Sequence, residues 1–122
     1  MTVTSYRDLV AWQKSMDLTV SLYAASSVFP REEAYGLTAQ VRKAGVSVPS
    51  NIAEGQGRKS TAEFLHHLSI ALGSLNELET QLLIAGRLKF IAGQQVDVLL
   101  EQCGEVGRLI NGLYNSLSPK LM

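Results

Sequence analysis

The sequence is poor in the residues that build disulfides, metal sites and membrane spans. Its only cysteine, Cys103, excludes an internal disulfide and a cysteine metal pair, and it fits a reducing compartment. No run of about 18 apolar residues is present, so no segment is expected to span a membrane. The first residues contain no basic segment followed by an apolar stretch, so no secretory signal is expected and the predicted location is the cytoplasm.

The chain also lacks an excess of charge of either sign. Its 11 Lys and Arg residues balance 11 Asp and Glu residues. The sequence therefore has no bulk attraction for nucleic acid, and any such binding must come from a local patch. With 122 residues, of which 46% are hydrophobic, the chain is expected to form a single domain, residues 1–122.

Apolar residues recur at helical spacing in four segments, and no segment alternates convincingly as a strand would. The segments cover about residues 7–26, 33–56, 61–86 and 94–117. A capping box at residues 60–63 begins the third segment, and Pro119 ends the fourth. Similar lengths and short connections predict an all-α fold, an antiparallel up-down-up-down four-helix bundle.

The first and fourth segments contain more apolar residues than one helix face needs. The predicted core stripe of the first segment consists of Leu9, Trp12, Met16, Val20 and Tyr23. Two further sets lie away from the main stripes, namely Ala11, Leu18 and Leu22 in the first segment and Val98, Leu109 and Leu113 in the fourth. Their regular spacing favours burial in a self-association interface, and scattered surface residues are the alternative.

The second segment contains Pro49 in its interior. Proline lacks an N–H donor, and its ring presses on the carbonyl group four residues earlier, here that of Gly45. Glycine lets the backbone move aside, and the hydroxyls of Ser47 and Ser50 are expected to donate to the freed carbonyls. A continuous helix kinked at Pro49 is therefore favoured over two short helices broken near Val48.

Polar residues form a stripe beside the apolar face of the second segment: Gln40, Lys43, Ser47, Asn51 and Glu54. A structural polar network between helices or subunits and a contact with a ligand or RNA both remain open. In the third segment, Glu79 projects into the leucine stripe, where a carboxylate needs a partner. Because an antiparallel hairpin places it near Gln40, we expect Glu79 to join this network by bonding to Gln40, Arg42 or Tyr23.

Catalytic and metal motifs are incomplete. Glu63 and His66 form one Glu-x-x-His pair, whereas a di-iron bundle needs two pairs and two further glutamates. The glycine-rich residues 55–60 lack the strand and the spacing of a P-loop. No serine, histidine and acid set has the spacing of a triad, and Cys103 lies on an apolar face. We therefore expect no metal, no cofactor and no enzymatic activity.

Basic residues gather toward one end of the predicted bundle: Arg7, Arg58, Lys59, Arg108 and Lys120. One subunit would carry a weak patch, but the same patch repeated around a ring would follow a nucleic-acid backbone. A phosphate is also expected to fit the helix N-terminus beside Arg58 and Lys59. The candidate nucleic-acid contacts are Arg58, Lys59, Arg7, Arg42 and Lys43.

Several motifs together carry a family resemblance: Tyr35-Gly36-Leu37-Thr38, Ser47-Val48-Pro49-Ser50-Asn51-Ile52-Ala53-Glu54-Gly55 and Asn76-Glu77-Leu78-Glu79-Thr80-Gln81. With them, the chain resembles the four-helix-bundle proteins encoded in intervening sequences of bacterial 23S ribosomal RNA genes. The resemblance covers nearly the whole chain and weakens after about Ala92.

This resemblance implies a homopentameric ring of up-down bundles, similar to the accessory protein of diversity-generating retroelements. That relative is associated with a reverse transcriptase and nucleic acid, so the resemblance implies binding of RNA or DNA. The family has no established activity. A scaffold that binds another protein, without a nucleic-acid ligand, is the alternative function.

Overall fold

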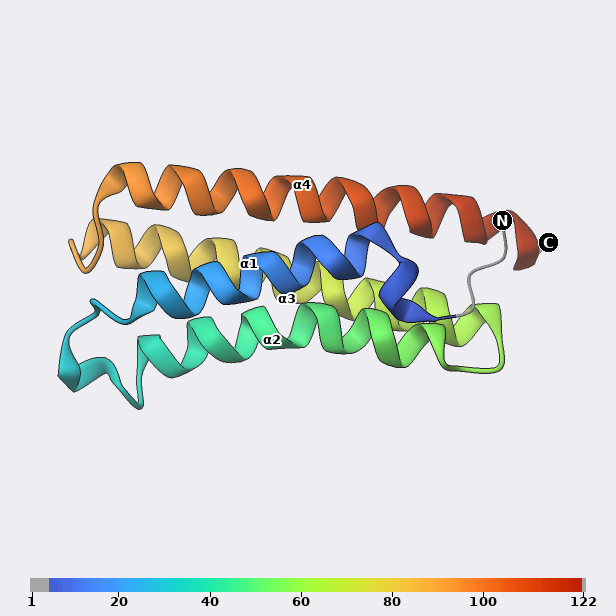
Figure 1. Ribbon diagram of the computed structural model, residues 1–122, viewed down its shortest axis with the longest axis horizontal. Coiled ribbons are helices and arrows are strands. Elements are labelled where there is room, and N and C mark those ends of the chain that lie inside the picture. Colours follow the sequence, from blue (N-terminus) through green and yellow to red (C-terminus); the bar gives the residue numbers. More distant parts are fainter. Residues whose placement is uncertain (1–4, 122) are drawn as a thin grey trace.

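The computed structural model describes residues 5–121, which form four long helices (Figure 1). The helices are α1 (Val10–Ser26), α2 (Leu37–Gln56), α3 (Thr61–Arg87) and α4 (Gly93–Leu117). Three short 3-10 turns flank them: η1 (Tyr6–Asp8), η2 (Arg31–Glu33) and η3 (Ser118–Leu121). Residues 5–121 contain no strand, so the predicted all-α class is confirmed.

Each helix packs against two neighbours. α1 contacts α2 and α4, and α3 contacts the same two helices. In Figure 1 the chain runs leftward in α1, back in α2, leftward again in α3 and back in α4. The outer face shared by α1 and α2 therefore lies on the opposite side of the bundle from the face shared by α3 and α4.

Side-chain caps position the helix starts. Ser60 Oγ accepts a hydrogen bond from Glu63 N at 3.1 Å, which confirms Ser60 as the N-cap of α3. The Glu63 carboxylate accepts from the Ser60 hydroxyl at 3.2 Å and not from the backbone N–H that a full capping box uses. Before α2, Glu33 Oε1 accepts from Leu37 N at 3.0 Å. α1 begins later than predicted because Ser5 caps the short turn η1 instead, with its Oγ 3.1 Å from Arg7 N.

The buried faces of α2, α3 and α4 are formed by the apolar residues that recur at helical spacing in the second, third and fourth segments. Their fully buried members include Val41, Val48, Ile52, Leu68, Leu78, Leu82, Leu99 and Ile110. Two members of the expected second set on α4, Leu109 and Leu113, pack partly against this core, whereas Val98 is exposed. None of the helices within residues 5–121 is long and apolar enough to cross a membrane.

The predicted core face of α1 is wrong from Met16 onward, and of its five members only Leu9 and Trp12 pack partly against the core. Ala11, Leu18 and Leu22 are buried, and the expected core residues Met16, Val20 and Tyr23 are 40%, 68% and 43% exposed. Both faces of α1 are apolar, so hydrophobic spacing does not distinguish them. The true inner face also contains two serines, which lowers its apparent hydrophobicity. Their hydroxyls bond within the helix, Ser15 to Trp12 O at 2.8 Å and Ser26 to Tyr23 O at 3.4 Å.

α2 is continuous through Pro49 and does not divide into two helices. The carbonyl of Gly45, to which Pro49 has no N–H to donate, accepts a hydrogen bond from Thr19 Oγ1 of α1 at 3.1 Å. The single proton of this hydroxyl is shared with Ser15 O, which lies 2.8 Å away within α1. The expected donor Ser47 bonds instead to Ser74 of α3, so the prediction of a donor from α2 itself is wrong. The bend at Pro49 stays a prediction.

Gly45 has a packing role as well. A Cβ atom at this position would lie 2.5 Å from Leu22 Cδ1, which is far inside van der Waals contact. The glycine thus lets α1 approach the backbone of α2 closely enough for Thr19 to reach the freed carbonyl.

Candidate functional site

A chain of polar side chains joins α2 to α3. Ser47 Oγ lies 2.8 Å from Ser74 Oγ, and Asn51 Nδ2 donates to Ser47 O at 2.8 Å and to Ser47 Oγ at 3.0 Å. Asn51 Oδ1 lies 3.0 Å from His67 Nδ1. Because an amide oxygen only accepts, His67 Nδ1 is the donor. Two of the predicted polar residues therefore serve a contact between helices, together with Ser74 and His67, which the sequence did not single out.

The other predicted polar residues of α2 have separate partners. Gln40 Oε1 accepts a long hydrogen bond from Gln81 Nε2, at 3.5 Å, and Gln81 also donates to Glu77 Oε1 at 3.3 Å. Glu54 pairs with Arg58 Nη2 at 2.5 Å on the exposed end of α2. Lys43 is exposed. The polar stripe is thus not one continuous network.

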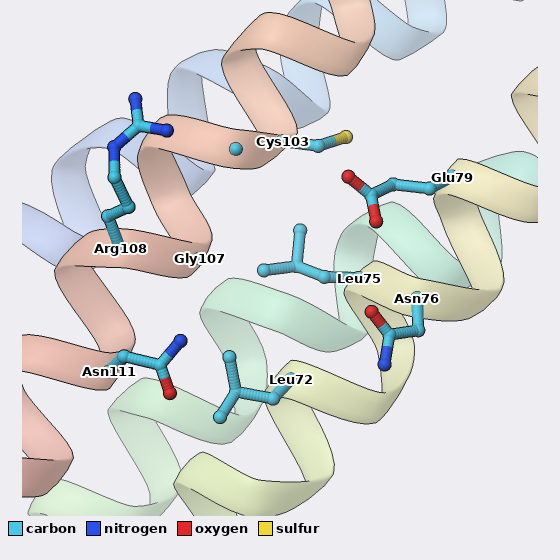
Figure 2. A pocket seen from close by; sticks show the side chains of 9 residues that line it. Leu72, Leu75, Asn76, Glu79, Cys103, Gly107, Arg108 and Asn111 are labelled. Atoms are coloured by element: carbon cyan, nitrogen blue, oxygen red, sulfur yellow. The ribbon is translucent and has the colours of Figure 1, made fainter.

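The predicted partners of Glu79 are wrong. Arg42 donates from Nε to Ser26 Oγ at 2.8 Å and from Nη2 to Tyr23 O at 3.3 Å, and Gln40 bonds to Gln81. Glu79 instead faces α4 (Figure 2). Two residues turn a helix by about 200°, so Gln81 and Glu79 lie on opposite sides of α3. The length of an antiparallel hairpin predicts the position of Glu79 along the bundle axis, but it does not predict which neighbouring helix the side chain faces.

Glu79 lines a pocket of about 340 Å³ between α3 and α4, which we call the α3–α4 pocket. Its walls are Leu72, Leu75, Asn76 and Glu79 from α3, and Cys103, Gly104, Gly107, Arg108 and Asn111 from α4. Figure 2 shows the Glu79 carboxylate and the Cys103 thiol on facing helices, directed toward one another.

Cys103 is a neutral thiol near neutral pH. Burial raises the pKa of Cys103 from 9.0 to about 12, and the nearby negative charge of Glu79 adds to this increase. Because the thiolate is the reactive form, a cysteine with this pKa is a poor nucleophile. Within residues 5–121, no three His, Cys, Asp or Glu side chains are grouped to hold a metal ion.

A second hollow surface lies on the outer face of α1 and α2. One part, of about 340 Å³, is lined by Tyr6, Trp12, Met16, Thr19, Val46, Pro49, Ser50 and Ala53. The adjoining part, of about 510 Å³, is lined by Tyr23, Ala34, Tyr35, Thr38, Ala39, Arg42, Lys43 and Val46. Val46 borders both parts, so we treat them as one α1–α2 groove. The groove is mostly apolar, and Tyr35 on its rim is fully exposed.

The five candidate nucleic-acid residues do not form one patch. η1, which carries Arg7, and the α2–α3 connection, which carries Arg58 and Lys59, lie at the same end of the bundle (Figure 1). Lys43 lies about 20 Å away along α2, at 1.5 Å per residue. The guanidinium of Arg42 is held against α1 and stacks 4.6 Å from the centre of the Tyr23 ring. Arg108 lines the α3–α4 pocket, and the side chain of Lys120 lies outside the described part of the chain.

Comparison with known proteins agrees with this bundle. The family model of 23S rRNA-intervening sequence proteins matches residues 7–112. A crystal structure of a protein of unknown function from the S23 ribosomal protein family of Bacteroides thetaiotaomicron VPI-5482 has a similar fold, with a TM-score of 0.79. The two chains are 24% identical over 86% of this chain and 98% of that chain. No curated protein matches the sequence. The length of the family match establishes that the chain belongs to the 23S rRNA-intervening sequence protein family.

Proposed function

We propose that this chain is a non-enzymatic assembly protein that associates with copies of itself through the α1–α2 groove. The observation that carries the proposal is the exposure of large apolar side chains beside one another there. Met16, Tyr23 and Val46 are 40%, 43% and 41% exposed although they line a single groove. Contiguous apolar surface of this kind is typical of protein contact sites.

A second copy of the chain suits the groove better than a partner of opposite charge. The net charge of the chain is zero, so two copies do not repel each other over long distances, and no charged partner is attracted. The guanidinium of Arg42, which borders the groove, is also engaged within the chain, since it bonds to Ser26 and Tyr23. The closed ring of five copies that the family resemblance implies would need a head-to-tail contact between two different faces.

Light scattering coupled to size exclusion would test this assembly. We expect the wild-type chain to elute as an oligomer, and the double variant Met16→Glu/Val46→Glu to elute near the subunit mass of 13.3 kDa. Leu83→Glu is the matched control, because Leu83 is 50% exposed on α3 outside the groove. Circular dichroism would verify that each variant is helical. A wild-type monomer at every concentration, or an oligomer that the double variant leaves intact, would contradict the proposal.

Nucleic-acid binding is the second candidate function, and the observation that favours it is the shared location of Arg7, Arg58 and Lys59. All three side chains are exposed at one end of the bundle, and an assembly would repeat them. The ion pair with Glu54 occupies Arg58, so we expect Glu54→Gln to strengthen binding and Arg58→Ala/Lys59→Ala to weaken it.

A filter-binding titration with structured RNA and with duplex DNA would measure this function. Affinity should fall steeply between about 50 and 200 mM salt if phosphate contacts dominate. Arg31→Ala/Arg87→Ala is the control, because it removes two exposed charges elsewhere. A flat salt response, or the same affinity in the Arg58→Ala/Lys59→Ala variant, would argue against this candidate.

A further inference from the structure

The α3–α4 pocket is kept open by two glycines of α4 that close packing does not require. A Cβ at Gly107 would lie 3.8 Å from Leu75 Cδ1, which is ordinary contact. One at Gly104 would lie 3.3 Å from Arg108 Nη1, and a small shift of that long side chain would relieve the contact. Each glycine inside a helix costs about 1 kcal/mol relative to alanine. The two glycines therefore lower the stability of α4, and close packing of the helices does not account for their presence.

Two opposite charges line this space without pairing. The described residues contain two ion pairs, Lys14 with Glu105 and Arg58 with Glu54, and neither involves Glu79 or Arg108. No hydrogen bond within residues 5–121 engages the Glu79 carboxylate or the Arg108 guanidinium either. Glu79 is half-buried, whereas Arg108 is exposed and its guanidinium lies beside Gly104, so both charged groups remain accessible to a ligand.

The remaining walls are suited to a small polar molecule with an apolar part. Asn76 of α3 and Asn111 of α4 also line the pocket, each three residues from one of the charged residues, and each carboxamide can both donate and accept hydrogen bonds (Figure 2). Leu72 and Leu75 give the pocket an apolar side. Its volume of about 340 Å³ is at the small end of the usual range for ligand sites.

We propose that the α3–α4 pocket binds a small zwitterion of the α-amino acid type. The ligand ammonium would pair with the Glu79 carboxylate, and the ligand carboxylate would pair with the Arg108 guanidinium. Its side chain would lie against Leu72 and Leu75. A simple cation would leave Arg108 unpaired beside it, and a simple anion would face Glu79, so a molecule carrying both charges is the better complement. This site is on the opposite face from the α1–α2 groove and does not depend on self-association.

Nuclear magnetic resonance of the full chain would test the site. A mixture of the proteinogenic α-amino acids is added at millimolar concentration to ¹⁵N-labelled protein, and the strongest binder is then identified singly. We expect shifts confined to the amides around Asn76, Glu79, Cys103 and Arg108. The decarboxylated amine and the deaminated acid of that amino acid should each bind at least about tenfold more weakly, since each loses one charge-assisted contact.

Matched variants separate the site from a general effect on the fold. Glu79→Gln and Arg108→Gln should each weaken binding by about tenfold or more, whereas Asp97→Asn and Arg87→Gln, which remove exposed charges elsewhere, should leave it unchanged. Gly107→Leu should abolish binding by filling the pocket in a chain that is still helical. The proposal is overturned if no amino acid shifts these amides, if both one-charge analogues bind as well as the amino acid, or if Glu79→Gln and Arg108→Gln bind normally. Light scattering of the same samples reports self-association separately.

Discussion

The α1–α2 groove and the α3–α4 pocket are built alike and lined differently. Each lies between two neighbouring antiparallel helices, and the first part of the groove has the same volume as the pocket, about 340 Å³. The groove is lined by the apolar side chains of Trp12, Met16 and Val46, while the pocket is lined by the charged residues Glu79 and Arg108. Residues beside the buried stripes thus give the two faces of the bundle different surface chemistry. The buried stripes themselves stabilise the bundle.

The packing beneath the two faces differs in the same way. On the α1–α2 side, Gly45 admits the side chain of Leu22 and leaves no room for a Cβ. On the α3–α4 side, Gly107 leaves room that its neighbours do not fill. Gly45 thus allows two helices to approach closely, whereas Gly107 leaves space between two helices.

The largest effect on stability is expected from a substitution of Leu18, which is buried on the inner face of α1. Leu18→Ala should lower the free energy of unfolding by about 3 kcal/mol, because the side chain is fully buried and leaves a cavity. Val20→Ala on the same helix, where the side chain is 68% exposed, should change it by less than about 0.5 kcal/mol. Urea unfolding at one protein concentration would measure both. Equal losses would mean that the inner and outer faces of α1 are assigned incorrectly.

Substitution of Gly45 and of Gly107 by alanine should change the stability of the protein in opposite directions. Gly45→Ala should destabilise the protein by about 2 kcal/mol, since its Cβ would meet the buried Leu22. Gly107→Ala should stabilise it by about 0.5 to 1 kcal/mol through helix propensity. Thermal unfolding of the two variants would give the sign of each effect. A stabilising Gly45→Ala would show that Leu22 moves aside freely, and the proposed difference between the faces would fail.

Loss of the Thr19 hydroxyl should have a smaller effect. Thr19→Val leaves the Gly45 carbonyl without its partner from α1, and we expect a loss of about 1.5 kcal/mol. Thr80→Val is the control, because Thr80 Oγ1 donates only to Asn76 O within its own exposed helix turn. Chemical unfolding would detect the difference, and identical values for the two variants would remove the role assigned to Thr19.

The smallest expected effect is the contribution of Cys103, in the α3–α4 pocket, to the pH dependence of stability. The folded Cys103 thiol keeps its proton up to about pH 12, whereas the unfolded thiol loses its proton near pH 9.0. Between these values the folded state binds more protons, so stability falls as pH rises. We expect Cys103 to contribute a loss of about 1 kcal/mol by about pH 9.5 relative to neutral pH. Urea unfolding of wild type and Cys103→Ala would test this, because the variant should lack that part of the pH dependence.

The sequence predicts the fold well because three helices have one dominant apolar face. In α2, the spacing of Val41, Val48 and Ile52 leaves no competing stripe, and the structure buries all three. α1 has two apolar faces, and the buried one includes Ser15, whose hydroxyl is satisfied by its own helix. Because Ser15 is polar, the hydrophobic spacing of α1 favours the opposite face, which the structure shows to be the outer one.

The polar contacts are less predictable because they depend on the rotation of one helix against another. The sequence places Ser47 and Asn51 beside the core, but it does not indicate that Ser74 and His67 lie opposite them. Likewise, Glu79 and Gln81 are two residues apart, and only the packed orientation of α3 determines which of them meets α2. Spacing within one helix contains no information on these contacts.

The hydrogen bond from Thr19 to Gly45 has a consequence for the order of folding events. In most helices the backbone can complete its own bonding pattern before any partner arrives, but α2 cannot do so at Pro49. The missing partner of the Gly45 carbonyl comes from a residue 26 positions earlier in the chain. Completing the backbone bonding of α2 and docking α1 are therefore one cooperative event, so that a peptide of α2 alone would lack part of its own helix stability.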